Sequence, residues 1–165
     1  ITSSDWSSDV CSSDLTMKMI LTFSIGWLVW LAFANAYSIE KSGNLTLKID
    51  NVRTIGGTIW VGIYDDADHL FVKEKAIVKG FNVGKTGTIT CTIEELPYGT
   101  YAVALFHDVN SNGELDRNLA GIPTEPFAFS QKPKSRWRLP YFEEVKFAFL
   151  RDQQVLQTRL KRWWE

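Results

Sequence analysis

Apolar and polar residues alternate along several short stretches of this chain, and that period of two restricts its fold more than any other feature. Successive side chains of a β-strand point to opposite faces, so alternation is typical of a strand with one buried face. Residues 101–106 are apolar at every position, which predicts a central strand. The alternating stretches cover residues 45–50, 59–64, 88–93, 145–150 and 156–160, and a shorter strand is expected over 76–81.

Turn residues separate these stretches at short intervals. Gly56-Gly57 precedes one of them, and Asp65–Lys75 leaves room for one helical turn. Strands spaced roughly 8–12 residues apart indicate a β-sandwich. The expected fold is therefore all-β: an antiparallel β-sandwich of about seven strands, transthyretin-like or immunoglobulin-like, preceded by an N-terminal signal helix. Tyr101 stands where such domains place a tyrosine corner, although an ordinary core tyrosine is an equal alternative.

The N-terminal residues differ from the rest of the chain. Residues 1–16 include a Ser/Asp-rich run, Asp5–Leu15, that resembles the in-frame translation of a sequencing-library adapter. We treat this segment as non-native and exclude it from the fold. A native tail of low complexity is the alternative interpretation.

Residues 17–36 are typical of a signal peptide. Lys18 precedes an uncharged apolar run over residues 20–33, and Ala34-Asn35-Ala36 offers the small side chains that a signal peptidase requires. The run is shorter than the roughly 20 residues of a transmembrane helix, which disfavours the alternative of an uncleaved membrane anchor. We expect export to the periplasm or the extracellular space, with Tyr37 as the first mature residue. A short linker over 37–43, one domain over 44–160 and a basic aromatic tail over 161–165 would follow.

Cysteine and charge counts exclude two classes of protein. Cleavage after residue 36 would remove Cys11 and leave Cys91 alone, on the apolar face of its strand, so no disulfide framework is expected. Eighteen Lys and Arg residues against nineteen Asp and Glu give no electrostatic basis for binding nucleic acid. A cell-envelope protein or a glycan remains as a candidate partner, and contact with a membrane is expected only through an uncleaved signal segment.

Oxygen-bearing side chains recur at fixed spacing just after the central strand. Asp108, Asn110, Asn112 and Asp116 occupy positions 1, 3, 5 and 9 of a loop with Gly113 at position 6, as in an EF-hand calcium loop. The backbone carbonyl of Glu114 at position 7 would add a ligand, and Leu115 would point into the core. The sequence therefore predicts a structural calcium site, for which a turn held by Asx hydrogen bonds is the alternative.

The match to an EF-hand fails at position 12, where Leu119 replaces the bidentate glutamate. The missing carboxylate could come from Glu125, Asp65, Asp66 or Glu143, among which the sequence does not choose. His107 adjoins the loop and could act as a general base or a zinc ligand. A histidine hydrogen-bonded to nearby backbone is the favoured interpretation, because His69 is the only other imidazole.

The same region resembles a known family of exported bacterial proteins, catalogued as domain of unknown function two-one-four-one. The matching residues are Leu96-Pro97-Tyr98-Gly99-Thr100-Tyr101-Ala102-Val103, Phe106-His107-Asp108, Asn110, Asn112-Gly113, Leu115-Asp116, Gly121-Ile122-Pro123, Phe129-Ser130 and Phe142. The resemblance covers about residues 44–160. It implies a small periplasmic or secreted β-sandwich related in style to transthyretin-like modules, and it implies no established activity.

A basic run with one aromatic residue follows, and it provides a candidate ligand surface formed by Arg136, Trp137 and Arg138. It could contact phosphate, lipid headgroups or an acidic glycan, and a solvated loop is the simpler interpretation. Taken together, the sequence favours an exported, non-catalytic β-sandwich with a calcium-binding-type loop, acting as a binding or structural accessory protein. The alternatives are a metal-assisted hydrolase using His107 beside the ion and a glycan-binding module using Trp60 or Trp137.

Overall fold

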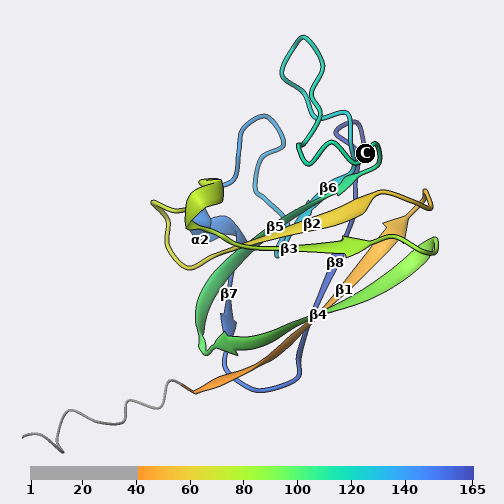
Figure 1. Cartoon of the computed structure of the whole chain (residues 1–165). Coiled ribbons are helices and arrows are strands. Elements are labelled where there is room, and N and C mark those ends of the chain that lie inside the picture. The colour runs from red at the N-terminus through yellow and green to blue at the C-terminus, as the bar shows by residue number, and fades with distance from the viewer. Residues whose placement is uncertain (1–40) are drawn as a thin grey trace, which may run out of the picture. The chain divides into compact units, whose positions relative to one another are not determined.

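Two β-sheets make up the part of the chain that the computed structural model describes, residues 41–165 (Figure 1). The expectations for the adapter-like segment and the signal peptide concern residues outside this part. The strands are β1 Ser42–Val52, β2 Thr58–Tyr64, β3 Ile77–Asn82, β4 Gly87–Pro97, β5 Gly99–Asp108, β6 Phe127–Phe129, β7 Lys146–Phe149 and β8 Gln154–Arg159. A 3-10 turn, η1, covers Lys73–Lys75, and a single helical turn, α2, covers Phe142–Val145.

One sheet has the order β4-β1-β8, and the other has the order β3-β2-β5-β6. Strand β7 also pairs with β5, along Gly99–Ala102, whereas β6 pairs with Ala104–Phe106 further along the same strand. All pairings are antiparallel except that of β1 with β8, which is parallel. The all-β sandwich predicted from the alternation is confirmed, with two additions: the short strand β6 and one parallel pair.

The core lies between the two sheets and is built by the alternating positions. In β1, Leu45, Leu47 and Ile49 are fully buried, while the residues between them face outward. Cys91 of β4 lies opposite Leu47 and is 4% exposed, which confirms its predicted place on the apolar face. Side chains from β2, β5 and β7 complete the same cluster, so the two sheets share one core.

Strand β5 is central, as its apolar sequence predicts, because β2 pairs with one edge and β6 and β7 pair with the other. Its outer face is covered as well: Ala102 is buried against Phe142 and Val145 of α2. Ser130 links α2 to β5, since its Oγ accepts a hydrogen bond from the Val103 amide and donates one to the Val145 carbonyl. Burial on both faces explains why this strand shows no alternation.

Tyr101 at the start of β5 forms the expected tyrosine corner. Its hydroxyl donates a hydrogen bond of 3.0 Å to the carbonyl of Pro97, four residues upstream. The bond ties the start of the central strand to the β4–β5 turn. Between β2 and β3, the Asp65–Lys75 segment contains a turn over residues 67–71 and one short helical element, η1, in line with the expected single helical turn. Within residues 41–165, no helix has the length and apolar character needed to span a membrane.

Candidate functional site

The predicted calcium loop begins at the last residue of β5 and leads, through a protruding hairpin, to β6 (Figure 1). Directly opposed residues of an antiparallel pair project to the same face of the sheet. Asp108 lies opposite Thr58, on the outer face, whereas His107 lies opposite the fully buried Ile59, on the core face. The two adjacent side chains therefore point to opposite sides of β5.

Asp108 is the anchor of the loop. The residue is 1% exposed, and its two carboxylate oxygens accept hydrogen bonds from the loop backbone and from Trp60. Oδ1 accepts from the Asn112 amide at 3.1 Å, and Oδ2 accepts from the Gly113 amide at 2.8 Å and from the Trp60 indole Nε1 at 3.1 Å. The carboxylate thus fixes the turn that follows it and joins that turn to β2.

The electrostatics of Asp108 follow from these contacts. Burial by itself would raise the pKa of this carboxyl group, because removal from water disfavours the charged form. Hydrogen bonds from the Gly113 amide, the Trp60 indole and the amides of Asn112 and Ser111 favour the charged form, and the net pKa lies below the usual value. Asp108 is therefore a buried anion at neutral pH.

Two further predicted ligands, Asn110 and Asn112, converge on a third, Asp116. The Asn110 amide nitrogen lies 2.7 Å from Asp116 Oδ2, and the Asn112 amide nitrogen lies 2.9 Å from Asp116 Oδ1. The amide oxygens accept backbone bonds: Asn110 Oδ1 from Asn112 N, and Asn112 Oδ1 from Glu114 N. The loop thereby brings together the oxygen-bearing side chains that the spacing singled out. The side chain of Glu114 is exposed, and its backbone amide donates to Asn112 Oδ1.

Gly113 provides the bend expected at position 6, since its φ of +81° lies in the region that favours glycine. At position 12, Leu119 is fully exposed near the tip of the hairpin and takes no part in the loop. One expectation is wrong: Leu115 is only half-buried and does not join the core. The loop protrudes beyond the end of β5 (Figure 1), away from the core between the sheets.

Glu125 closes the base of the loop from the returning arm of the hairpin. It is 7% exposed; Oε1 accepts a hydrogen bond from the Val109 amide at 2.9 Å, and Oε2 accepts one from the Asp116 amide at 3.2 Å. The other three carboxylates considered as the missing ligand are engaged elsewhere. Asp65 contacts His69, Asp66 accepts the Asp68 amide, and Glu143 pairs with Lys146.

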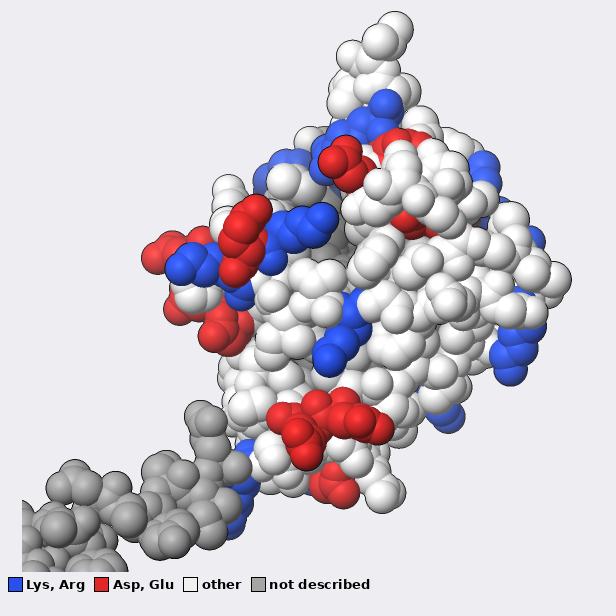
Figure 2. Space-filling view, in the orientation of Figure 1, with Lys and Arg blue, Asp and Glu red and all other residues white. Residues whose placement is uncertain are grey.

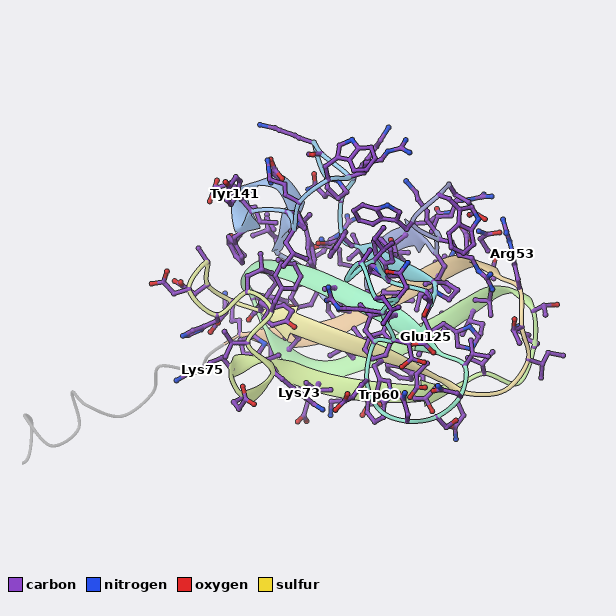
Figure 3. The ribbon with its side chains drawn as sticks, turned by 90° about the horizontal axis from the view of Figure 1, so that it is seen from above. Arg53, Trp60, Lys73, Lys75, Glu125 and Tyr141 are labelled. Carbon is purple, nitrogen blue, oxygen red and sulfur yellow. The ribbon has the colours of Figure 1, made fainter. Side chains whose placement is uncertain are left out.

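Trp60 supports the loop from below. Its ring lies over Gly80 of β3, where a Cβ atom would come within 2.8 Å of the indole. Seen from above, Trp60 and Glu125 lie near the loop, and Arg53 and Tyr141 lie away from it (Figure 3). Gly57 approaches the other side so closely that a Cβ there would stand 2.1 Å from the Asp108 carbonyl oxygen. The alternation of β2 and β5 predicts none of these supports, because each depends on strand pairing.

The donor set is oxygen-rich and short of histidine and cysteine. Among the described residues, no three His, Cys, Asp or Glu side chains form a group that could hold a metal ion. Carboxamides complete the cluster here: Asp108 and Asp116 supply two carboxylates, and Asn110 and Asn112 supply two amides. Segment 108–116 contains three acidic residues and no Lys, Arg or His. Hard oxygen donors of this kind suit calcium better than zinc.

His107 has the structural environment that the favoured interpretation predicts. The residue is 1% exposed, and its Nε2 lies 2.8 Å from the Gly56 carbonyl oxygen. Because the imidazole faces the core and the Asp108 carboxylate faces outward, the two groups do not share a cleft. The hydrolase alternative needs them beside one ion, and this geometry gives it no support.

The three residues of the candidate ligand surface, Arg136, Trp137 and Arg138, have different environments. Trp137 is 79% exposed, whereas Arg138 is committed to internal contacts. Its guanidinium forms two hydrogen bonds with the Glu144 carboxylate, at 2.6 and 3.0 Å, and lies 4.2 Å from the Tyr141 ring centroid. The bonds with Glu144 raise the pKa of Arg138, and those with Arg138 lower the pKa of Glu144. Arg136 is exposed and has no ion-pair partner in the described part of the chain.

The fold and the loop together define a small β-sandwich with a polar, oxygen-rich turn at the end of its central strand. The chain belongs to the bacterial family described as "Uncharacterized protein conserved in bacteria (DUF2141)", whose model matches residues 47–157. The resemblance noted from the sequence is thereby confirmed. No curated protein and no solved structure matches the chain significantly.

Proposed function

We propose that this protein is an exported, non-catalytic β-sandwich in which the 108–116 loop binds calcium as a structural ion. The observation that carries the proposal is the convergence of Asp108, Asn110, Asn112 and Asp116 within one turn. Two carboxylates and two carboxamides at alternating positions around a bend are the donors that calcium prefers. Such an ion would strengthen the end of the sandwich and leave the fold unchanged.

Calcium would replace hydrogen bonds that the loop now makes with itself. The amide nitrogens of Asn110 and Asn112 occupy the space beside both oxygens of Asp116. Rotation of each carboxamide about its last torsion exchanges nitrogen for oxygen and turns an acceptor toward the same space, at the expense of the backbone hydrogen bonds that Asn110 Oδ1 and Asn112 Oδ1 now accept. A cation there would balance the charge of Asp116 and lie near that of Asp108. Glu125, held at the base of the loop, is the nearest further carboxylate in the sequence-predicted set.

The affinity should be modest. Only two carboxylates, those of Asp108 and Asp116, are among the side-chain ligands of the turn, and the bidentate glutamate of position 12 is replaced by the exposed Leu119. Fewer charged ligands mean weaker binding, so we expect a Kd of about 10⁻⁴–10⁻³ M, the range of extracellular modules. Binding to the folded state alone stabilises by about 1.4 kcal/mol at roughly tenfold excess over Kd.

Thermal unfolding of residues 37–165 tests the site. Millimolar calcium should raise the melting temperature of the wild type by several degrees, about 2–8 °C per kcal/mol, and magnesium should not. Asp116→Asn should remove most of this rise. The matched control is Asp65→Asn, in an exposed pair with His69 away from the loop, and it should keep the full rise. Equal responses of both variants to calcium would contradict the site.

Export is the second part of the proposal and is tested separately. Expressed from Met17 in a Gram-negative host, the protein should be recovered from the periplasm with Tyr37 at its N-terminus. Recovery of the uncleaved precursor from the membrane fraction would contradict cleavage after Ala36.

A further inference from the structure

Two basic aromatic segments that lie far apart in the sequence meet at one end of the sandwich. Trp137 belongs to the loop between β6 and α2, and Trp163 belongs to the segment after β8. Their rings contact each other edge to face, with centroids 6.1 Å apart and planes at 77°. Neither segment is long enough alone to act as an interfacial anchor, but the fold joins them into one surface.

The C-terminal segment is held in place at both of its ends. The Lys161 backbone pairs with that of Phe127 in β6 through two hydrogen bonds, of 2.9 and 3.0 Å. Arg53 forms an ion pair of 2.6 Å with Glu165, and the Glu165 amide bonds to the Arg162 carbonyl at 3.0 Å. Trp163 and Trp164 therefore lie on a fixed turn, and Trp164 is 62% exposed.

The cations around these rings have no acidic partners in the described part of the chain. Arg136, Lys161 and Arg162 form no ion pair there, and the Arg162 guanidinium lies 5.4 Å from the Trp164 ring centroid. We define the aromatic–basic patch as Arg136, Trp137, Lys161, Arg162, Trp163 and Trp164. In Figure 2, Lys and Arg side chains lie at the upper end, where the 131–141 loop stands in Figure 1; acidic side chains lie there as well, and further Lys and Arg side chains are spread over the rest of the visible face.

The sequence that leads up to α2 and contains Trp137 is basic, and Glu143 and Glu144 follow it within α2. Residues 117–142 contain five Lys and Arg and a single acidic residue, Glu125, whose oxygens face backbone amides at the base of the calcium loop. An exposed group of indole rings with unpaired cations matches the interface of an anionic bilayer. Trp rings partition to that interface, and Lys and Arg are attracted by its negative surface potential.

We propose that the aromatic–basic patch docks the folded domain on an anionic lipid bilayer. The proposal does not depend on calcium. A glycan platform would present rings in a common plane, whereas Trp137 and Trp163 stand nearly perpendicular. Rings at right angles can instead insert into the irregular apolar layer of a bilayer. Arg136, Lys161 and Arg162 then contact lipid phosphates around them.

Vesicle flotation of residues 37–165 tests the proposal. The described residues 41–165 contain a continuous core of their own, so this part is expected to fold without the preceding segment. The probes are vesicles of phosphatidylcholine alone and vesicles that also contain phosphatidylglycerol. A chelator is present in both samples, so that calcium is absent. The domain should float with the anionic vesicles, and binding should weaken as salt is added.

Two double variants separate the contributions. Arg136→Gln with Arg162→Gln should reduce binding about fivefold for each cation removed, and Trp137→Ala with Trp164→Ala should reduce it by about tenfold. The matched control is Leu150→Ala with Arg151→Gln: these exposed residues lie in the turn before β8, at the other end of that strand, and their removal should leave binding unchanged. Melting curves without vesicles confirm that each variant is folded.

Several results would overturn the proposal. Equal binding to neutral and anionic vesicles would exclude the role of the cations, and an equal loss in the Leu150/Arg151 control would exclude the patch as the contact. Retention on an acidic polysaccharide without any vesicle binding would assign the patch to a glycan. Because calcium is absent throughout, none of these results bears on the calcium loop, and a failed calcium titration does not affect the lipid experiment.

Discussion

The 108–116 loop, which we propose as the calcium site, and the aromatic–basic patch lie on the same domain but satisfy their side chains in opposite ways. In the loop, polar groups turn toward one another, and Asp108, Asn110, Asn112 and Asp116 all have hydrogen-bond partners within it. In the patch, Trp137 and Trp164 are exposed, and Arg136, Lys161 and Arg162 form no ion pair within residues 41–165. A closed loop contributes to stability before any ligand arrives, whereas an open patch contributes only when a partner covers it.

The largest effect on stability is expected from Asp108→Ala. The substitution leaves the Asn112 and Gly113 amides and the Trp60 indole without their acceptor at a buried position. Each lost bond to a charged group is worth about 1.5–3 kcal/mol and the losses are not additive, so we expect destabilisation of about 3–5 kcal/mol in chelator. Urea unfolding measures it. A loss below about 1 kcal/mol would show that the loop closes without its anchor.

Gly57→Ala tests the packing on the other side of the same residue. The new Cβ would stand 2.1 Å from the Asp108 carbonyl oxygen, and the φ of +72° is strained for alanine. We expect a loss of about 2–3 kcal/mol. Gly56→Ala is the matched control, since its φ of +94° carries the same strain but its Cβ meets nothing within 4 Å. Equal losses would mean that the contact with Asp108 contributes nothing.

The buried thiol of Cys91 should make the stability of the domain depend on pH. Burial raises the pKa of its thiol from 9.0 to about 11, since the thiolate is disfavoured away from water. Between these two values the unfolded chain loses its proton and the folded chain keeps it, so stability falls as pH rises from about 9 to about 11. Cys91→Ala should lack this decrease. The native thiol should also resist labelling reagents at neutral pH, and rapid labelling would contradict its burial.

The smallest effect on stability is expected in the patch. Trp137→Ala removes a ring that is mostly exposed and has one edge contact, with Trp163, so the free energy of unfolding should change by no more than about 0.5 kcal/mol. Chemical denaturation of this variant and of Asp108→Ala under the same conditions compares the two losses in free energy of unfolding directly. A loss of more than about 2 kcal/mol would place Trp137 in the core and remove the contrast between the two regions.

The sequence predicts the regular parts of this molecule because alternation is a local signal. The strands with one buried face, the central β5 and the tyrosine corner of Tyr101 all follow from residues within a few positions of one another. The three-residue strand β6 and the parallel pairing of β8 with β1 could not be predicted in this way. Each is set by contacts with distant residues, and three residues are too few for a periodic pattern.

The candidate sites show the same division. The spacing of Asp108, Asn110, Asn112 and Asp116 identifies the loop, because its ligands are close in sequence. The choice of Glu125 among four carboxylates, and the support from Trp60, depend on how the hairpin returns and how β2 pairs. The basic run around Arg138 looks uniform in sequence, yet Glu144 pairs with that cation, and Trp163 contacts the ring of Trp137.

The most direct test of the calcium assignment is an NMR titration of residues 37–165 with calcium. The Trp60 indole N–H and the Gly113 amide both donate to Asp108 Oδ2, so each reports on the carboxylate that the ion would share. We predict that both resonances shift together and saturate with a Kd of about 10⁻⁴–10⁻³ M, while magnesium leaves them in place. Unchanged Trp60 and Gly113 resonances at saturating calcium would contradict the account, and the loop would then be a turn held by its own hydrogen bonds.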